Sequence, residues 1–341
     1  MEELIAAGAP WPGAVAVSGG GDSIALMHLL ARWAKKTRRA PPIVVTVDHG
    51  LREGSAGDAK KVARWAKAAG LGVQILRWSG PRPKSDIEAA AREARYRLMG
   101  GWAAKKNLTA LYVAHSRDDQ AETFLLRLMR GSGLDGLAAM RPLSPYPVPG
   151  FRDLRLVRPL LAIERDALRA HLTCAGQAWL EDPMNGEARF ARVRLRQVMP
   201  ALEEAGLTRA RIASAAAHLA RAREALDTVT AAVIARAASP RDDAIHLDAV
   251  ALVAAPREVG LRALAQLLMH VSGQSYRPRF ERLERLYDRI AAETLGGGVT
   301  LHGCRIFLVP ARQGAFGPGT LGIARETARS RGKSSNNTVP P

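Results

Sequence analysis

Residues 14–23 read Ala-Val-Ala-Val-Ser-Gly-Gly-Gly-Asp-Ser, and no other ten residues restrict the fold of this chain as much. A short apolar run ends in three glycines, and a helical pattern starts soon after them. A strand that turns this tightly into a helix leaves backbone N–H groups facing one concavity, where the helix dipole adds partial positive charge. Side chains at the glycines would keep an anion away from that backbone. The segment therefore predicts a phosphate-binding loop between a strand and a helix.

Two side chains of this loop can add to phosphate binding. Asp22 can hold Mg²⁺, and Ser23 can donate a hydrogen bond to a phosphate oxygen. The loop lacks the GxxxxGK(S/T) spacing of a Walker A site and the GxGxxG spacing of a dinucleotide site. A purely structural interpretation stays open, in which the turn is only glycine-rich and Asp22 or Ser23 caps the helix.

Strand and helix signals alternate through the first half of the chain. The expected strands span 14–18, 43–48, 72–77 and 109–114, and the expected helices span 22–36, 55–69, 86–105 and 118–130. This alternation indicates βαβ units and a parallel sheet. We therefore predict an α/β fold with a Rossmann-like, doubly wound parallel sheet, followed by a smaller, mainly helical domain.

The pattern changes after residue 150, where a helix is expected over 160–172 and alanine-rich helices over 209–238. We expect a catalytic domain over 1–205, a mainly helical domain over 206–310 and a tail over 325–341. The tail is rich in Ser, Arg, Asn and Pro and has no apolar period, so we expect it to be disordered.

Polar clusters follow three of the predicted strands. The first strand leads into residues 18–23, the second into Asp48 and His49, and the fourth into the segment 115–122. Ligands of doubly wound sheets bind outside the carboxyl ends of the strands. The three clusters therefore predict one site at this rim.

Acidic side chains open the helix after the fourth strand. Asp118, Asp119 and Glu122 share one helical face near its N-terminus, because residues three and four apart are neighbours on a helix. Beside a phosphate loop, such carboxylates can hold Mg²⁺ or a cationic amine. A local interpretation stays open, since Ser116 and Asp119 also fit a capping box.

The charge of the chain points to a polyanionic partner. The formal net charge is +18 at pH 7, and residues 189–223 hold eight arginines against two acids. Proteins this basic usually bind nucleic acid. A compositional bias toward arginine is the alternative, although a bias alone does not explain the clustering.

Cysteine usage and hydropathy exclude other classes of protein. Cys174 and Cys304 form no CxxC, which argues against a disulfide framework, a zinc site and a Cys-ligated iron–sulfur cluster. No apolar run approaches the length of a membrane span, and the first residues are acidic, unlike those of a signal peptide. We therefore expect a cytoplasmic protein.

The loop sequence SGGGDS resembles SGGxDS, the pyrophosphate-binding signature of the N-type ATP pyrophosphatases, or PP-loop superfamily. Further segments are similar to the tRNA(Ile)-lysidine synthase family and follow the order of that family: 48–52, 88–96, 118–133, 158–161 and 181–196. The most specific of them is 118–133, which begins Asp-Asp-Gln-Ala-Glu-Thr.

This resemblance implies an enzyme that uses ATP and Mg²⁺ to attach free L-lysine to the wobble cytidine of tRNA(Ile) with a CAU anticodon. The cytidine oxygen would first be adenylated, with release of pyrophosphate. The neutral ε-amine of lysine would then displace AMP. The domain over 206–310 would contact the tRNA.

The resemblance also implies four sets of site residues. The catalytic set is Asp22, Asp119, Glu122 and Arg192. The ATP and phosphate set is Ser18, Gly19, Gly20, Gly21, Asp22, Ser23, Asp48, His49 and His115. The metal set is Asp22 and Asp119, and the tRNA set is Arg189, Arg194, Arg196, Arg209 and Arg211.

The chain departs from the family pattern in three places. Ser116 stands where members often carry a second histidine, and Val193 stands where an asparagine is common. We also expect the distal C-terminal module of longer members to be missing. The alternatives are another tRNA-modifying or amidating PP-loop enzyme, such as a thiolating one, a non-catalytic RNA-binding protein and a nucleotide-binding regulator. A homodimer also stays open, because nothing in the sequence decides the oligomeric state.

Overall fold

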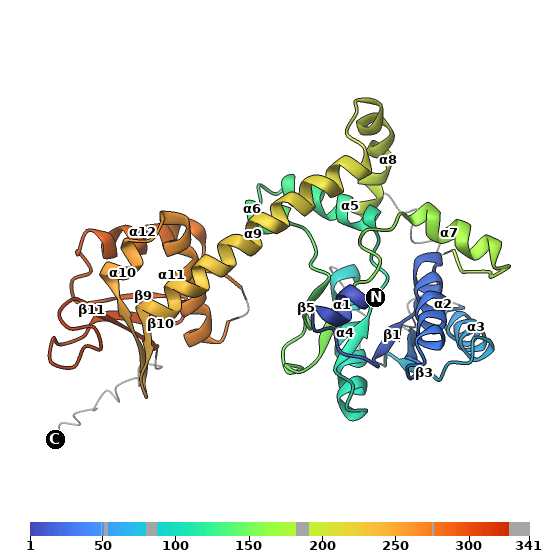
Figure 1. Ribbon diagram of the computed structural model, residues 1–341, viewed down its shortest axis with the longest axis horizontal. Coiled ribbons are helices and arrows are strands. Elements are labelled where there is room, and N and C mark those ends of the chain that lie inside the picture. Colours follow the sequence, from blue (N-terminus) through green and yellow to red (C-terminus); the bar gives the residue numbers. More distant parts are fainter. Residues whose placement is uncertain (49, 51–53, 80–86, 182–190, 275, 327–341) are drawn as a thin grey trace, which may run out of the picture. The chain divides into compact units, whose positions relative to one another are not determined.

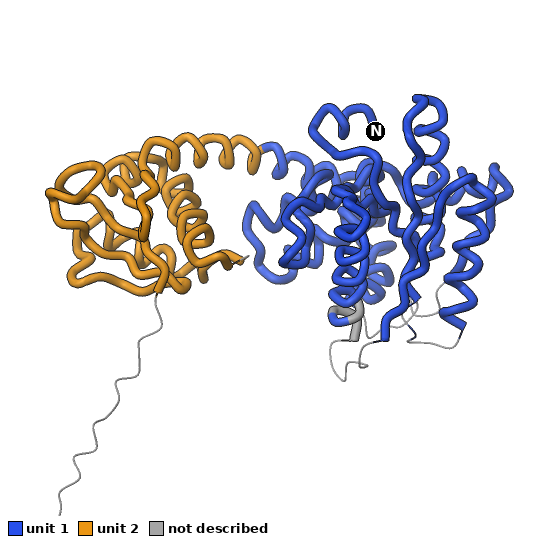
Figure 2. Tube along the Cα trace, turned by 90° about the horizontal axis from the view of Figure 1, so that it is seen from below, with its two compact units in different colours: residues 1–221 blue, residues 222–341 orange. Residues whose placement is uncertain are grey.

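The computed structural model describes residues 1–48, 50, 54–79, 87–181, 191–274 and 276–326 (Figure 1). The chain divides into two units, 1–221 and 222–341, inside the long helix α9 (Arg209–Ala237) (Figure 2). The division lies after the 205/206 boundary expected from the sequence, because Ile212 near the start of α9 packs into the core of the first unit.

A six-stranded sheet forms the centre of the first unit, with the strand order β3-β2-β1-β4-β6-β5. Its strands are β1 (Ala14–Ala16), β2 (Ile43–Asp48), β3 (Val73–Arg77), β4 (Ala110–Tyr112), β5 (Leu143–Pro145) and β6 (Arg155–Val157). All pairs are parallel except β5 with β6. The order reverses at β1 and β4, so their carboxyl ends flank the switch point at which such sheets bind ligands.

Helices cover both faces of this sheet. Val15 and Val44 pack with α2 (Gly21–Lys36), α3 (Ser55–Ala68) and α7 (Arg165–Cys174), whereas Ala14 and Val45 pack with α4 (Ile87–Lys105). Neighbouring strand residues point to opposite faces, so a strand buried on both faces is apolar along its length. The doubly wound α/β fold predicted from the sequence is confirmed.

The start of α7 differs from the prediction. The helix expected over 160–172 begins instead at Arg165. Tertiary contacts set this start, because the Arg165 N–H donates to the Asp118 carboxylate at 2.9 Å and the Arg117 N–H donates to the Ile163 carbonyl at 2.8 Å. Arg117 and Asp118 are the first two residues of the helix after β4, far away in the sequence.

Away from the sheet, an apolar cluster joins α5 (Arg117–Leu128) to α8 (Ala191–Glu204) and to the start of α9. It contains Ala121, Leu125, Leu195, Met199 and Ile212. Packing of α8 on α5 brings the arginines of α8 beside the acidic start of α5. The other short helices of this unit are α1 (Glu2–Ala6) and α6 (Leu134–Leu137).

The second unit combines helices with a five-stranded antiparallel sheet of order β7-β8-β11-β10-β9. Its elements after α9 are β7 (Ala238–Pro240), β8 (Ala244–Asp248), α10 (Ala249–Val253), α11 (Arg257–Ser272), α12 (Phe280–Ala291), β9 (Val299–Leu301), β10 (Cys304–Leu308) and β11 (Thr320–Arg325). The sequence prediction of a mainly helical domain did not include this sheet, in which β8 and β11 pair Ile245 with Ile323. The predicted disorder of the tail concerns 327–341, which lie outside the described residues, while Arg325 ends β11.

None of the described helices combines the length and the apolar character needed to cross a membrane.

Candidate active site

The glycine loop after β1 has the strand-to-helix geometry of a phosphate site. Helix α2 starts at Gly21, its N-cap is Gly20, and no side chain caps it. The structural alternative in which Asp22 or Ser23 only caps this helix is therefore wrong. The Ser23 hydroxyl instead donates to the Gly20 carbonyl at 2.8 Å and lies 3.3 Å from the Ser18 hydroxyl.

The three glycines of the loop are not equivalent. Gly19 has a φ of +99°, and a Cβ there would lie 2.5 Å from Cδ1 of Leu180. At Gly21 a Cβ would meet Trp179 at 3.6 Å, which is an ordinary contact. The backbone therefore requires glycine at position 19, whereas position 21 has room for a side chain.

The acidic start of α5 faces this loop. Asp119 accepts hydrogen bonds from the backbone N–H and the hydroxyl of Ser116, at 2.8 and 2.9 Å. This is the predicted capping box, and it fixes one oxygen of Asp119 while the other oxygen contacts Arg165 at 3.3 Å. The local and the functional interpretations of Asp119 are thus compatible.

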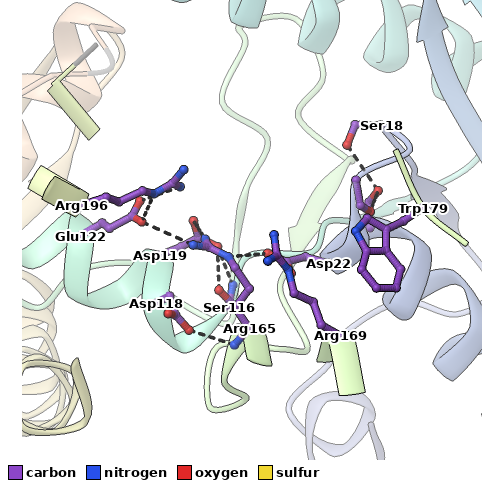
Figure 3. A network of polar contacts seen from close by, with 12 residues as sticks. Ser18, Asp22, Ser116, Asp118, Asp119, Glu122, Arg165, Arg169, Trp179 and Arg196 are labelled. Carbon is purple, nitrogen blue, oxygen red and sulfur yellow. Dashed lines mark hydrogen bonds and ion pairs between the residues drawn. The ribbon is translucent and has the colours of Figure 1, made fainter. Parts of the chain in front are cut away.

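Arg165 connects the phosphate loop to α5, a role that the sequence analysis missed (Figure 3). Its Nε lies 3.1 Å from the Asp22 carboxylate, and its two terminal nitrogens lie 3.3 Å from Asp119 and 3.7 Å from Glu122. Asp22, Asp119 and Glu122 are called the carboxylate cluster below. A cation is unfavourable at the first residue of a helix, so an arginine there is a sequence signal for an acidic partner.

Arg196 is a second guanidinium at this cluster. It reaches the buried Glu122 from α8 through Nε at 2.7 Å and through a terminal nitrogen at 3.3 Å. Arg209 similarly binds Asp118 at 3.4 Å and Glu203 at 2.5 Å. Two of the arginines expected to contact tRNA are therefore paired with carboxylates of α5.

The protonation behaviour of the carboxylates differs. Burial raises the pKa of Asp22 above its usual value, although Arg165 opposes the shift. Burial also acts to raise the pKa of Asp119, but hydrogen bonds from Ser116 and the charges of Arg165 and His115 outweigh it and lower that pKa. Asp119 therefore stays ionised, while Asp22 is the better proton acceptor of the two.

His115 follows β4 and lies beside Asp119. Burial lowers the pKa of His115 to about 4, with the charge of Asp119 opposing the shift, so the imidazole is neutral at pH 7. Its Nδ1 is buried and has no hydrogen-bond partner among the described residues. A neutral imidazole with a free ring nitrogen can bind a ligand placed at this rim.

The remaining predicted site residues are placed as follows. Asp48 ends β2 and accepts hydrogen bonds from the Gly50 N–H at 3.2 Å and from the Ser55 hydroxyl at 2.6 Å. Arg192 and Arg194 lie on α8, and Arg211 on α9 donates to the Gly206 carbonyl at 2.6 Å. His49 and Arg189 lie outside the described residues.

The side chains at the site show whether it fits the expected Mg²⁺. Among the described residues, no three His, Cys, Asp or Glu side chains converge closely enough to hold a metal ion by themselves. Mg²⁺ commonly binds through one or two carboxylates together with substrate phosphates. Asp22 and Asp119, which share Arg165, therefore fit a Mg²⁺ that arrives with a nucleotide.

A doubly wound sheet with a phosphate loop and an acidic cluster at its switch point defines a nucleotide-binding enzyme of the PP-loop class, and the PP-loop domain family matches residues 10–202. Two relatives named tRNA(Ile)-lysidine synthase match over most of the chain. That of Methylobacterium nodulans is 41% identical and covers 97% of this chain and 95% of its own length. That of Ruegeria pomeroyi is 44% identical and covers 78% of this chain and 62% of its own length. The chain therefore belongs to the tRNA(Ile)-lysidine synthase family.

A solved structure supports the fold alone. The U34-tRNA thiolase NcsA from Methanococcus maripaludis matches with a TM-score of 0.50 and 16% identity, over 62% of this chain and 71% of that one.

Proposed function

We propose that this enzyme attaches L-lysine to the wobble cytidine of tRNA(Ile) with a CAU anticodon and releases AMP and pyrophosphate. The observation that carries the proposal is the position of the carboxylate cluster. It adjoins the glycine loop through Arg165. Groups that can bind a nucleoside triphosphate and groups that can bind a cationic amine therefore lie side by side at one edge of the sheet.

In the first half-reaction, the cytidine O2 attacks the α-phosphorus of ATP. The bond between this phosphorus and the bridging oxygen breaks, and pyrophosphate leaves toward the loop. Backbone N–H groups at residues 18–21 and the positive end of α2 hold the leaving phosphates. Ser18 and Ser23 add hydroxyl donors at the same place.

In the second half-reaction, the lysine ε-amine attacks C2 of the cytosine, and AMP leaves with the former cytidine oxygen. The amine arrives as an ammonium ion and must lose a proton before it can attack. Asp119, whose pKa is lowered, suits electrostatic binding of the ammonium.

We further propose that Asp22 and Asp119 hold Mg²⁺ together with the ATP phosphates. When bound, this ion neutralises charge that develops on the transferred and leaving oxygens. The two carboxylates supply the protein ligands, and the nucleotide supplies others.

The tRNA would lie against α8 and the start of α9. Arg192, Arg194 and Arg211 are the described arginines proposed to contact phosphates, and Arg192 lies close enough to His115 to lower its pKa. Arg196 and Arg209 are proposed instead to position the acids of α5. The tRNA-contacting role of 206–310 stays part of the proposal, as does a cytoplasmic location, where ATP and tRNA are available.

A homodimer stays a possible state of the enzyme. Light scattering of the purified protein decides the oligomeric state.

The test is AMP release from ATP with Mg²⁺ and unmodified tRNA(Ile) bearing a CAU anticodon, with and without each common amino acid. Release that requires both the tRNA and lysine, with labelled lysine retained in the RNA, supports the proposal. Release that depends on tRNA but not on lysine keeps PP-loop chemistry and excludes lysine as the substrate. RNA binding without AMP release favours a non-catalytic RNA-binding protein.

A further inference from the structure

Arg165 is a cation inside a cluster that the proposed reaction needs for other cations. We propose that its guanidinium is an internal counter-cation, which holds the carboxylate cluster in the nucleotide-free enzyme. It yields the cluster to an incoming cation and turns to the phosphates of ATP when the nucleotide binds. The inference rests on the proposed function for the identity of the incoming cation, a divalent metal ion or the lysine ammonium.

The backbone of Arg165 is fixed independently of its side chain. Its N–H donates to Asp118 at 2.9 Å, the preceding Glu164 forms an ion pair with Arg117, and Ile163 accepts a hydrogen bond from the same Arg117. The start of α7 is therefore held on α5 without the guanidinium. The side chain can move while its helix stays in place.

The contacts of the guanidinium differ from those of a permanent ion pair. Charge-assisted N–H···O bonds are usually 2.7–2.9 Å long, and Arg196 meets this range at Glu122 with 2.7 Å. Arg165 instead contacts three carboxylates at 3.1, 3.3 and 3.7 Å (Figure 3). It is a shared cation, whereas Arg196 is the close partner of Glu122.

The charge of the cluster shows why a replacement is required. Three carboxylates face Arg165 and Arg196, so loss of the Arg165 contacts leaves two unneutralised charges in a half-buried site. Like charges at close range oppose ionisation of one another. Another cation must therefore enter as Arg165 leaves.

The nucleotide offers the guanidinium a second partner. Arg165 Nε lies 3.1 Å from Asp22, the second residue of α2, and the glycine loop immediately precedes it. Guanidinium groups bind phosphate through several donors of fixed geometry. A rotation of the side chain therefore exchanges a carboxylate for a phosphate held in the loop.

A rigid brace is the competing explanation of the same contacts, and it predicts the opposite sign. A brace that holds the carboxylates in place for a cation loses affinity for that cation when it is removed. Removal of a competing side chain instead raises the affinity of the cluster for that cation, because binding equilibria at shared groups are reciprocal and typically coupled by about 5- to 150-fold.

The experiment measures cation binding by the nucleotide-free protein and ATP binding by the same variants. Mn²⁺, followed by electron paramagnetic resonance, stands for the divalent metal, and calorimetry follows L-lysine. For Arg165→Ala we expect about fivefold or greater tightening of Mn²⁺, L-lysine or both, together with weaker ATP binding. Tightening confined to one probe identifies the incoming cation.

Arg97→Ala is the control. Arg97 lies on α4 and pairs with the exposed Glu93 at 2.7 Å, away from the carboxylate cluster. Its removal takes the same charge from the protein, and we expect less than about twofold change in Mn²⁺ or L-lysine affinity, because distant charges are screened.

A folded Arg165→Ala protein with unchanged or weaker binding of both probes would overturn the inference. If that variant does not fold, Arg165→Lys takes its place, since a single ammonium cannot contact three carboxylates at once and is a poorer competitor. Neither measurement involves tRNA or turnover. Failure of the wild-type protein to release AMP therefore counts against the proposed function, and failure of the cation affinity to rise counts against this inference.

Discussion

Glu122 and Arg196 form a half-buried ion pair although 74 positions separate them in the chain. Glu122 is 4% exposed, and Arg196 donates to both of its oxygens. The pair joins α5 to α8, two helices that also share an apolar cluster. Its strength therefore affects both the position of the acidic site and the stability of the first unit.

Arg196→Ala should destabilise the protein. A buried carboxylate that loses a charged hydrogen-bond partner costs about 1–3 kcal/mol, and Arg165 at 3.7 Å compensates only in part. Urea unfolding measures the change. Arg97→Ala is the control, because the pair of Arg97 with Glu93 is exposed and its loss should cost about 0.5 kcal/mol or less. Equal effects of the two substitutions would contradict the prediction.

Gly19→Ala should impair the phosphate loop, whereas Gly21→Ala should not. A positive φ costs an alanine about 1–2 kcal/mol, and a Cβ at Gly19 also meets Leu180. We expect a lower melting temperature and at least about tenfold weaker ATP binding for Gly19→Ala, since a loss of 1.4 kcal/mol is a factor of ten in affinity. Calorimetry of the two variants side by side checks this, and an equal loss at Gly21→Ala would refute it.

Stability should fall as the pH drops from neutrality because His115 is buried and neutral. Its pKa is about 4 in the folded protein and its ordinary value is about 6.5, so the unfolded chain binds more protons between these values. Folding therefore loses stability as the pH falls through this window, by no more than about 3 kcal/mol from this residue.

His115→Gln should flatten this part of the profile, as measured by urea unfolding at pH 7 and pH 4.5. Several charges act on the imidazole: Asp119 raises its pKa, and Arg158, Arg92 and Arg192 lower it. Asp22 has the opposite effect on stability, because its raised pKa lets the folded state bind more protons and so gain stability as the pH falls. A variant profile as steep as that of the wild type would count against the assignment.

Asp22→Asn and Asp119→Asn should separate catalysis from RNA binding. Each substitution removes a charge that the proposed reaction uses, so we expect AMP release to fall by about 100-fold or more, in the range seen for loss of acid–base catalysis. The affinity for tRNA should change little, because phosphates contact arginines instead. Filter binding of the tRNA beside the AMP assay tests both parts, and unchanged turnover would exclude these acids from the reaction.

Arg194→Ala and Arg211→Ala should weaken tRNA binding and reduce its salt dependence. Each phosphate contact that is lost lowers the slope of log affinity against log salt by about 0.7–0.9. Arg97→Ala again serves as the control, because this arginine lies on α4 and pairs with Glu93. Slopes that match the wild type would show that the tRNA does not contact α8 and α9 at these residues.

Much of the first unit could be read from local patterns. The apolar runs and the glycines between them predicted β1 to β4 and the helices that follow, since hydrophobic period and turn chemistry are written into neighbouring residues. The capping box at Ser116 and Asp119 was predicted for the same reason. The acidic cluster and the phosphate loop were therefore both expected at the rim of the sheet.

Tertiary packing decided what these groups bind. Arg165 meets Asp22 across 143 positions, and Leu180 makes glycine necessary at position 19. The sheet of the second unit likewise depends on the pairing of Ile245 with Ile323. The hydrophobic period and the spacing of residues indicate which face of a helix or strand is apolar. They do not indicate which distant element packs against that face. The sequence alone thus defined the loop, its acids and their family, whereas only the packing of α7 and α8 on α5 determined which cations hold those acids.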